Sequence, residues 1–90
     1  SLLSTEITGA IYSTIANQRG FLLSGDPQFK ATRAAIWSEI DTMRTRFDAL
    51  ASTFTDPRNR EEWAKVKTLL AETRAIQDRA AEILVAYLER

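Results

Sequence analysis

Two Asp-Pro steps divide the 90-residue chain into three segments, and they constrain its fold more than any other feature. The steps are Asp26-Pro27 and Asp56-Pro57. Aspartate is favoured at the N-cap of a helix, and proline is favoured at the first helical position. Gly25 stands where a glycine in the left-handed conformation ends a preceding helix. The steps therefore predict three helices, over about residues 1–24, 27–54 and 57–90.

Apolar residues in all three segments recur with the spacing of a helical seam. The seam is weaker in the first segment, and in the other two it steps by 4, 3, 4, 3 and 4 residues. A seam of this period is typical of long helices packed side by side. The three seams consist of Leu3, Ile7, Ile11, Ile15 and Leu22, then Ile36, Ile40, Met43, Phe47, Leu50 and Phe54, and finally Leu69, Thr73, Ile76, Ala80, Ile83 and Tyr87.

Short connections make consecutive helices antiparallel neighbours, so the expected fold is an all-α, up-down bundle of long helices. The chain is expected to form one helical domain over residues 1–90 and to be a fragment of a longer protein. The third helix is the longest, and its last turns, with Leu84 and Leu88, would be half uncovered. We therefore expect three helices of a four-helix bundle. Either a fourth helix or a second copy of the chain, as in a homodimer, would complete it, and the sequence leaves both open.

Composition excludes several classes of function. The chain has no cysteine and no histidine, which removes thiolate nucleophiles and the commonest general base and metal ligands. The twelve basic residues are balanced by twelve acidic ones, so the basic excess of a nucleic-acid-binding protein is missing. We therefore expect no enzyme, no metal, no cofactor and no nucleic-acid partner.

Counting outward from the two turns predicts a polar layer inside the bundle. Gln18 is expected to lie opposite Arg33, and Arg33 opposite Gln77 and Asp78. Because an unpaired buried charge is costly, Arg33 needs a partner. One interpretation is an Arg33–Asp78 bridge that fixes the register of the helices.

The other interpretation of the polar layer is a binding site for a small organic anion. In this hypothesis Arg33 holds a carboxylate, because its planar fork can bind both oxygens. Gln18 and Gln77 are amide partners, and Trp37 forms an apolar wall.

The run Arg19-Gly20-Phe21-Leu22-Leu23-Ser24-Gly25-Asp26 is the most specific stretch of the chain. It resembles the signature of the CHASE-type extracytoplasmic sensor domain, third subtype, and similar stretches of the four-helix-bundle domains of chemotaxis receptors. The second corner, with Asp56, Pro57 and Trp63, is similar to that family's second turn. The resemblance covers about residues 12–90.

The resemblance implies a four-helix bundle held between two transmembrane helices of a dimeric bacterial receptor. Such a domain faces the periplasm and signals to a cytoplasmic chemotaxis or kinase module. This chain departs from the pattern by supplying three helices of four. Arg19 would bind an anion near the tip, neutralise Asp26, or hydrogen-bond the carbonyls that end the first helix. Gly20 would allow a neighbouring segment to approach closely.

A soluble three-helix scaffold is the alternative to a sensor. It accounts equally well for the heptads, the charge balance and the absence of catalytic groups. It does not account for the run that ends at the first Asp-Pro step.

Overall fold

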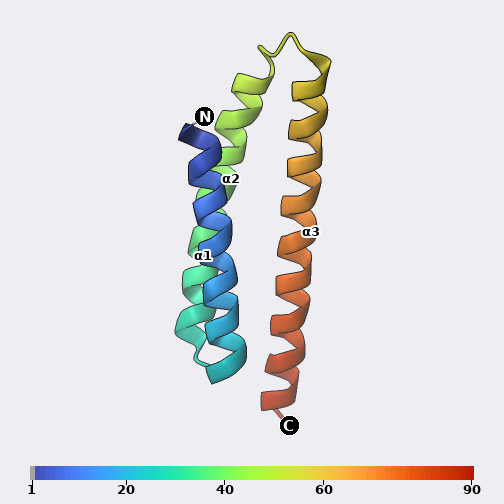
Figure 1. The fold of residues 1–90 in the computed structure, drawn as a ribbon. Helices are drawn as coiled ribbons and strands as arrows, with labels where there is room; N and C mark the ends of the chain where they lie inside the picture. Colours follow the sequence, from blue (N-terminus) through green and yellow to red (C-terminus); the bar gives the residue numbers. More distant parts are fainter. Residues whose placement is uncertain (1) are drawn as a thin grey trace.

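Three long antiparallel helices make up the whole of the structure, a computed structural model that describes residues 2–90. They are α1 (Leu2–Ser24), α2 (Pro27–Ala51) and α3 (Pro57–Leu88), and no strand occurs among the described residues. Their up-down order confirms the predicted all-α bundle, which measures 54 × 19 × 15 Å (Figure 1).

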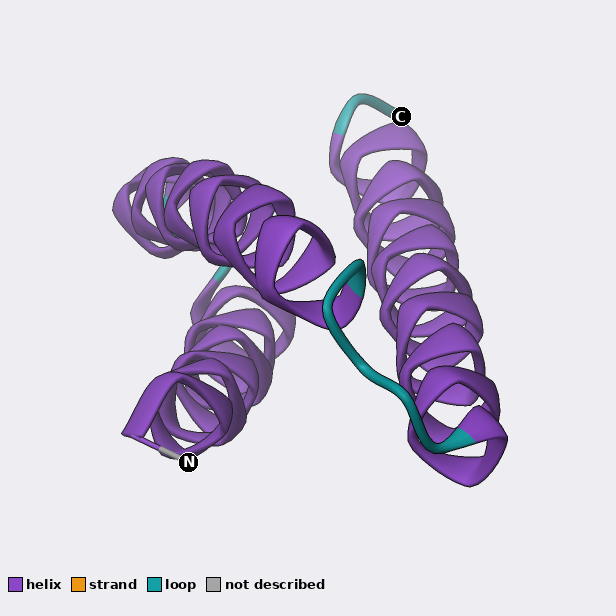
Figure 2. Ribbon diagram, turned by 90° about the horizontal axis from the view of Figure 1, so that it is seen from above, coloured by secondary structure: helices purple, strands orange, loops and turns teal. Residues whose placement is uncertain are grey.

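The three helices are not equally close to one another. α1 and α2 pack together along their length, whereas α3 makes far fewer close backbone approaches to either of them. Figure 2, seen along the bundle, shows α3 standing apart from the α1–α2 pair. α3 is therefore held mainly by long side chains that reach across to it.

Both Asp-Pro corners have the predicted capping chemistry. The Asp26 carboxylate accepts the backbone N–H of Gln28, and the Asp56 carboxylate accepts that of Arg58, each at 2.9 Å. Gly25 has a φ of +70°, the left-handed conformation in which glycine is favoured. These contacts fix the first residues of α2 and α3 after each reversal of the chain.

The second helix ends three residues earlier than the sequence indicates, at Ala51 rather than near Phe54. The hydroxyl groups of Ser52 and Thr53 each donate to a carbonyl three residues back, at 2.6 Å. Hydroxyl side chains that bond the backbone in this way compete with helix continuation. Arg60 then donates to the Phe54 carbonyl from Nε and Nη2, at 2.9 and 2.6 Å, which ties the loop to the start of α3.

The buried face of α3 differs from the predicted one. Its buried residues are Trp63, Leu70, Gln77 and Ala81. The predicted seam lies one residue earlier and points outward: Leu69, Ile76, Ile83 and Tyr87 are 60–70 % exposed. The prediction that this seam packs in the core is therefore wrong. One residue is a turn of about 100° around a helix, so the two stripes face different neighbours.

The main core lies at the end of the bundle away from the first corner. Its buried members come from all three helices and are Ile7, Trp37, Ile40, Ala51, Trp63 and Leu70. The seam predicted for α2 largely agrees, because Ile36, Met43 and Phe47 pack against this cluster from half-buried positions.

Two glycines of α1 provide a matched test of the packing at the first corner. A Cβ at Gly20 would lie 2.6 Å from the Phe29 ring, whereas a Cβ at Gly9 meets nothing within 4 Å. Gly9→Ala should raise the free energy of unfolding by about 0.5–1 kcal/mol through helix propensity. Gly20→Ala should lower it by about 1–3 kcal/mol through overpacking. Urea denaturation measures both, and equal effects of the two changes would refute the close approach of Phe29.

Candidate functional site

A layer of buried polar side chains joins all three helices about two turns from the first corner. Its members are Thr14 and Gln18 of α1, Arg33 and Trp37 of α2, and Gln77 of α3. Each is at most 8 % exposed. The layer therefore lies inside the bundle, where every polar atom needs a partner.

Gln77 is the centre of this layer. Its side-chain oxygen accepts two hydrogen bonds, one from Nη1 of Arg33 at 3.2 Å and one from the indole N–H of Trp37 at 2.8 Å. Its side-chain nitrogen donates to the Thr14 hydroxyl at 3.1 Å. Its backbone carbonyl accepts the side-chain amide of Gln18 at 3.0 Å. One residue of α3 is thus hydrogen-bonded to two residues of α1 and two of α2.

Arg33 carries the only charge inside the layer. Nη1 also donates to Asp78 at 3.0 Å, and the side chain of Asp78 is 51 % exposed. The predicted Arg33–Asp78 bridge is therefore formed. Nη1 alone makes these contacts, while Nε of Arg33 and Oε1 of Gln18 are buried without a hydrogen-bond partner. The edge of the guanidinium group that carries Nε therefore has an N–H group without an acceptor.

The structure brings together all five residues predicted for the site, Gln18, Arg33, Trp37, Gln77 and Asp78. Sequence reasoning missed Thr14, which is fully buried. The available signal was its spacing, because Thr14 lies one helical turn before Gln18 on the same face of α1.

The residues of the Arg19–Asp26 run at the first corner have mostly structural roles. Phe21 is buried, and Gly20 makes room for Phe29. Ser24 Oγ donates to the Gly20 carbonyl at 2.7 Å and accepts the Asp26 backbone N–H at 3.0 Å.

Arg19 differs from its neighbours in this run. It is exposed and has no ion pair or hydrogen bond with any residue of the described part of the chain. The expected contact of Arg19 with Asp26 or with the last carbonyls of α1 is therefore not formed.

Further polar contacts hold α3 to α2. Arg74 Nη1 lies 3.1 Å from an Asp41 carboxylate oxygen, and its guanidinium lies 5.4 Å from the centre of the Trp37 ring. Nearer the second corner, Asp48 accepts the Trp63 indole N–H at 2.6 Å and pairs with Lys67 at 3.1 Å. The hydrogen bonds from Trp63 and Lys67 hold the pKa of Asp48 below its ordinary value of 3.8.

The lowered pKa of Asp48 predicts acid sensitivity. A carboxylate whose pKa is lower in the folded state stabilises the fold above its unfolded pKa, and this contribution is lost as the pH falls through the folded pKa. Between about pH 5 and about pH 3, the wild-type chain should therefore lose more stability than Asp48→Asn. Urea denaturation across this range measures the difference, and parallel pH profiles of the two proteins would disprove the role of Asp48.

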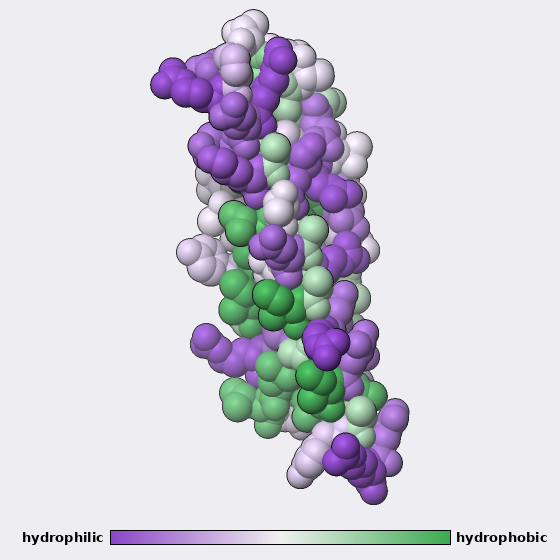
Figure 3. All heavy atoms as spheres, turned by 90° about the vertical axis from the view of Figure 1, so that its right-hand side faces the viewer, coloured by the Kyte–Doolittle hydropathy of each residue, from purple (hydrophilic) through white to green (hydrophobic). Residues whose placement is uncertain are grey.

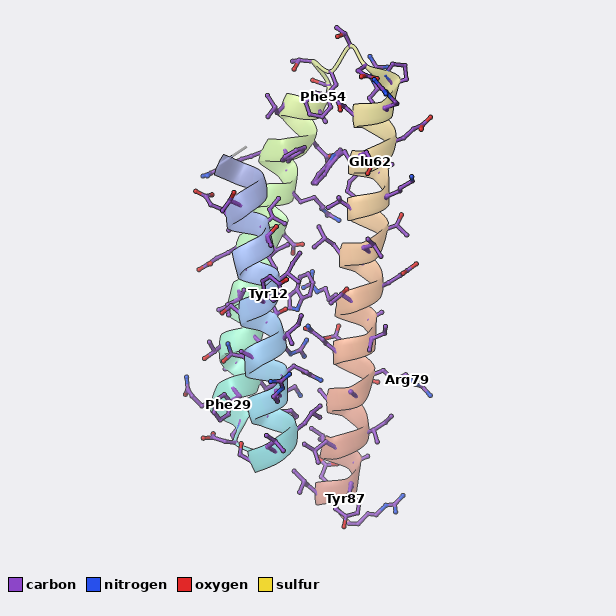
Figure 4. The ribbon with its side chains drawn as sticks, viewed as in Figure 1. Tyr12, Phe29, Phe54, Glu62, Arg79 and Tyr87 are labelled. Carbon is purple, nitrogen blue, oxygen red and sulfur yellow. The ribbon has the colours of Figure 1, made fainter. Side chains whose placement is uncertain are left out.

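An apolar groove of about 730 Å³ lies between α1, the end of α2 and the start of α3. Its walls include Ile7, Ile11, Phe47, Trp63, Val66 and Leu69. Phe47 and Trp63 are stacked, with ring centres 4.2 Å apart. Phe54 and Glu62 also line the groove, near the second corner (Figure 4). None of the five predicted site residues lines this groove.

Comparisons with protein-family models, with curated proteins and with solved structures give no match. Within the described residues, none of the helices is long and apolar enough to cross a membrane. The same residues hold no group of three or more side chains suited to bind a metal ion.

Proposed function

We propose that this chain is the extracytoplasmic signal-sensing part of a bacterial transmembrane receptor. The resemblance of the Arg19–Asp26 run to sensor domains supports this proposal. The observation that carries it is the polar layer, in which Gln77 hydrogen-bonds α1 and α2 at once. In this role the domain has no catalytic activity and belongs to a membrane-anchored homodimer.

The proposed mechanism is a change in the position of one helix relative to the others. A signal biases such a domain only if it binds one arrangement of helices better than another. α3 suits this mechanism because its backbone stands apart from α1 and α2 and because polar side chains hold its middle part, around Arg74 and Gln77, to α2. Packed helices have discrete arrangements, so a shift of about 1–2 Å in the layer is transmitted along the bundle. The receiving module is a chemotaxis or kinase output in the cytoplasm.

The proposed ligand is a small organic anion that binds Arg33. The unpartnered Nε of Arg33 supports this, because a carboxylate binds best to two N–H groups of one guanidinium edge. Asp78 competes for the same charge, and its half-exposed carboxylate regains water at little cost when it leaves Arg33. Gln18 and Gln77 supply amide groups, and Trp37 supplies an apolar wall. Binding would thereby loosen the contact between α2 and α3.

A thermal-shift series tests the ligand site. We expect one or more of malate, lactate, succinate and benzoate to raise the melting temperature of the wild-type chain above that in equal sodium chloride. Arg33→Met should abolish the shift and still fold, because the carboxylate left without its partner, that of Asp78, is 51 % exposed and is solvated by water rather than left as an unpaired buried charge. Arg46→Met, at an exposed position of α2, is the matched control and should keep the shift. A shift that persists in Arg33→Met would contradict the site.

A reporter fusion tests the location separately. Alkaline phosphatase is active only outside the cytoplasm, so its fusion behind this segment in the intact parent protein should be active in bacterial cells. An inactive fusion would favour the soluble three-helix scaffold. The exposed apolar residues of α3, Leu69, Ile76 and Ile83, favour the scaffold, because an exposed apolar stripe is typical of an interaction module.

A further inference from the structure

Two polar atoms of the buried layer have no hydrogen-bond partner among residues 2–90, and one is a donor while the other is an acceptor. They are Nε of Arg33, on α2, and Oε1 of Gln18, on α1. The two residues are only 5 % and 8 % exposed, so bulk water does not reach these atoms. Because buried polar groups without a partner are costly, a molecule that accepts from Nε and donates to Oε1 would be bound favourably.

The neighbours of these two atoms fix which is the donor and which the acceptor. Nε2 of Gln18 donates to the backbone carbonyl of Gln77 at 3.0 Å, and a carbonyl oxygen can only accept. The Gln18 amide therefore cannot be turned over, and its unpartnered atom is the acceptor. Nη1 of Arg33 already donates to Gln77 and Asp78, at 3.2 and 3.0 Å. The guanidinium group therefore offers a ligand the edge that carries Nε.

The other polar groups of the layer are already bonded to one another. The Thr14 hydroxyl donates its single hydrogen to the Ile11 carbonyl at 2.7 Å. Oε1 of Gln77 accepts from Arg33 and Trp37, which fixes the orientation of the Gln77 amide. Nε2 of Gln77 then donates to Thr14 at 3.1 Å. The missing donor and the missing acceptor must therefore come from a bound molecule rather than from the layer itself.

The two unpartnered atoms match the two polar groups of a 2-hydroxy acid. Arg33 and Gln18 both hydrogen-bond Gln77, so the groups that reach them must be close together on the ligand. A carboxylate suits the edge of Arg33 that carries Nε. A hydroxyl carries one hydrogen, which matches the single unpartnered acceptor, Oε1 of Gln18. An α-amino acid fits less well, because its ammonium group brings three N–H donors to this one acceptor.

The outer side of α3 offers a small acid no comparable groups. Figure 3, which faces α3, shows apolar side chains gathered along the half of that helix nearer its end. Ile76 and Ile83, in this half, are 70 % and 62 % exposed. The half-exposed carboxylate of Asp78, bonded to Arg33, is instead where solvent reaches the layer. An acid would enter there, where its carboxylate replaces that of Asp78.

We infer that the polar layer selects 2-hydroxy acids and that Gln18 is the residue that recognises the hydroxyl group. This inference rests on the anion site proposed above and adds to it the class of acid. Arg33 binds the carboxylate, which every organic acid provides, whereas Oε1 of Gln18 accepts the hydroxyl, which an unsubstituted acid lacks. A site built to hydrogen-bond a hydroxyl group discriminates strongly against the analogue without it, because a buried polar atom of the site then stays unpaired.

Matched pairs of acids test this inference on the wild-type chain, by isothermal titration calorimetry at equal ionic strength. L-lactate and propionate differ only in the hydroxyl group, and so do L-malate and succinate. In each pair that binds, we expect the hydroxy acid to bind at least tenfold more tightly than its analogue. L-alanine and L-aspartate, which have an ammonium group in place of the hydroxyl, should bind more weakly than the corresponding hydroxy acid.

Two variants of α1 separate recognition of the hydroxyl from the fold of the layer. Gln18→Met keeps the length of the side chain but has no amide oxygen, so it should bind both members of a pair with equal affinity. Thr14→Val, one helical turn away in the same layer, keeps Oε1 of Gln18 and is the matched control, which should retain the preference. Circular dichroism checks that both variants are helical, and the comparison in the wild-type chain stands without them.

The outcomes distinguish this inference from the anion site on which it rests. Equal affinities within each pair, for binding that Arg33→Met abolishes, would overturn the inference and leave the anion site standing, because a buried water would then satisfy Gln18. Tighter binding of the amino acids would overturn it in the same way. A preference that persists in Gln18→Met, or that Thr14→Val loses equally, would refute the role of Gln18. If none of these acids bound, the anion site and the inference would both be overturned.

Discussion

Gln77→Ala should lower the free energy of unfolding by at least ~3 kcal/mol, because several buried partners lose their bonds and each unsatisfied group costs ~1–3 kcal/mol. The Trp37 indole N–H loses its acceptor, the Thr14 hydroxyl loses its donor, and Arg33 keeps only Asp78. For a domain of this size, such a loss corresponds to a fall in melting temperature of roughly 10–25 °C. Thermal unfolding followed by circular dichroism measures it.

Two further variants separate the hydrogen bonds of Gln77 from its packing. Ile76→Ala changes the neighbouring residue, which is 70 % exposed, and should alter stability by less than ~0.5 kcal/mol. Gln77→Leu keeps most of the side-chain volume but has no polar group, so it should be destabilised nearly as much as Gln77→Ala. If Gln77→Leu were as stable as the wild type, Gln77 would not be the centre of the layer.

Trp63→Ala should lower the free energy of unfolding by about 3–5 kcal/mol, the usual loss when a buried aromatic side chain is truncated to alanine. Trp63 is 6 % exposed, stacks on Phe47, and donates its indole N–H to Asp48. It is the main apolar contact that fastens the start of α3 to the α1–α2 pair. Urea denaturation gives the loss directly.

Trp63→Phe is the control for this second prediction. It keeps an aromatic ring against Phe47 and removes the hydrogen bond to Asp48, so its loss of stability should be much smaller. Its stability should also vary less with pH below about pH 5, because Asp48 no longer has the indole partner. Similar losses for Trp63→Phe and Trp63→Ala would show that the stack contributes little.

Local rules predicted the corners and the polar layer well. Asp26, Asp56 and Gly25 act through neighbours one or two residues away, so their roles follow from sequence alone. Once the turns are known, the register of antiparallel helices is fixed, and this placed Gln18, Arg33 and Gln77 together. Thr14 was missed because a threonine on an apolar stripe gives no signal in hydropathy.

The orientation of α3 was not predictable from periodicity. Its two stripes, Leu69-Ile76-Ile83 and Trp63-Leu70-Gln77, both repeat every seven residues and differ by one position. The first stripe is the more apolar, yet the second lies inside, where Trp63 and Gln77 find hydrogen-bond partners on the other helices. Which stripe faces the core depends on these tertiary partners. The groove was missed for the same reason, since it forms where three helices meet.

Thiol labelling at two adjacent positions tests the central claim most directly, namely that α3 lies with its most apolar stripe outward. The chain has no cysteine, so Leu69→Cys and Leu70→Cys each introduce one thiol. Leu69 is 60 % exposed and Leu70 is 5 % exposed. We expect the thiol of Leu69→Cys to react with a maleimide nearly as fast as in the urea-unfolded chain, and that of Leu70→Cys to be protected at least tenfold. Protection at position 69 with rapid labelling at position 70, in the isolated chain, would contradict it.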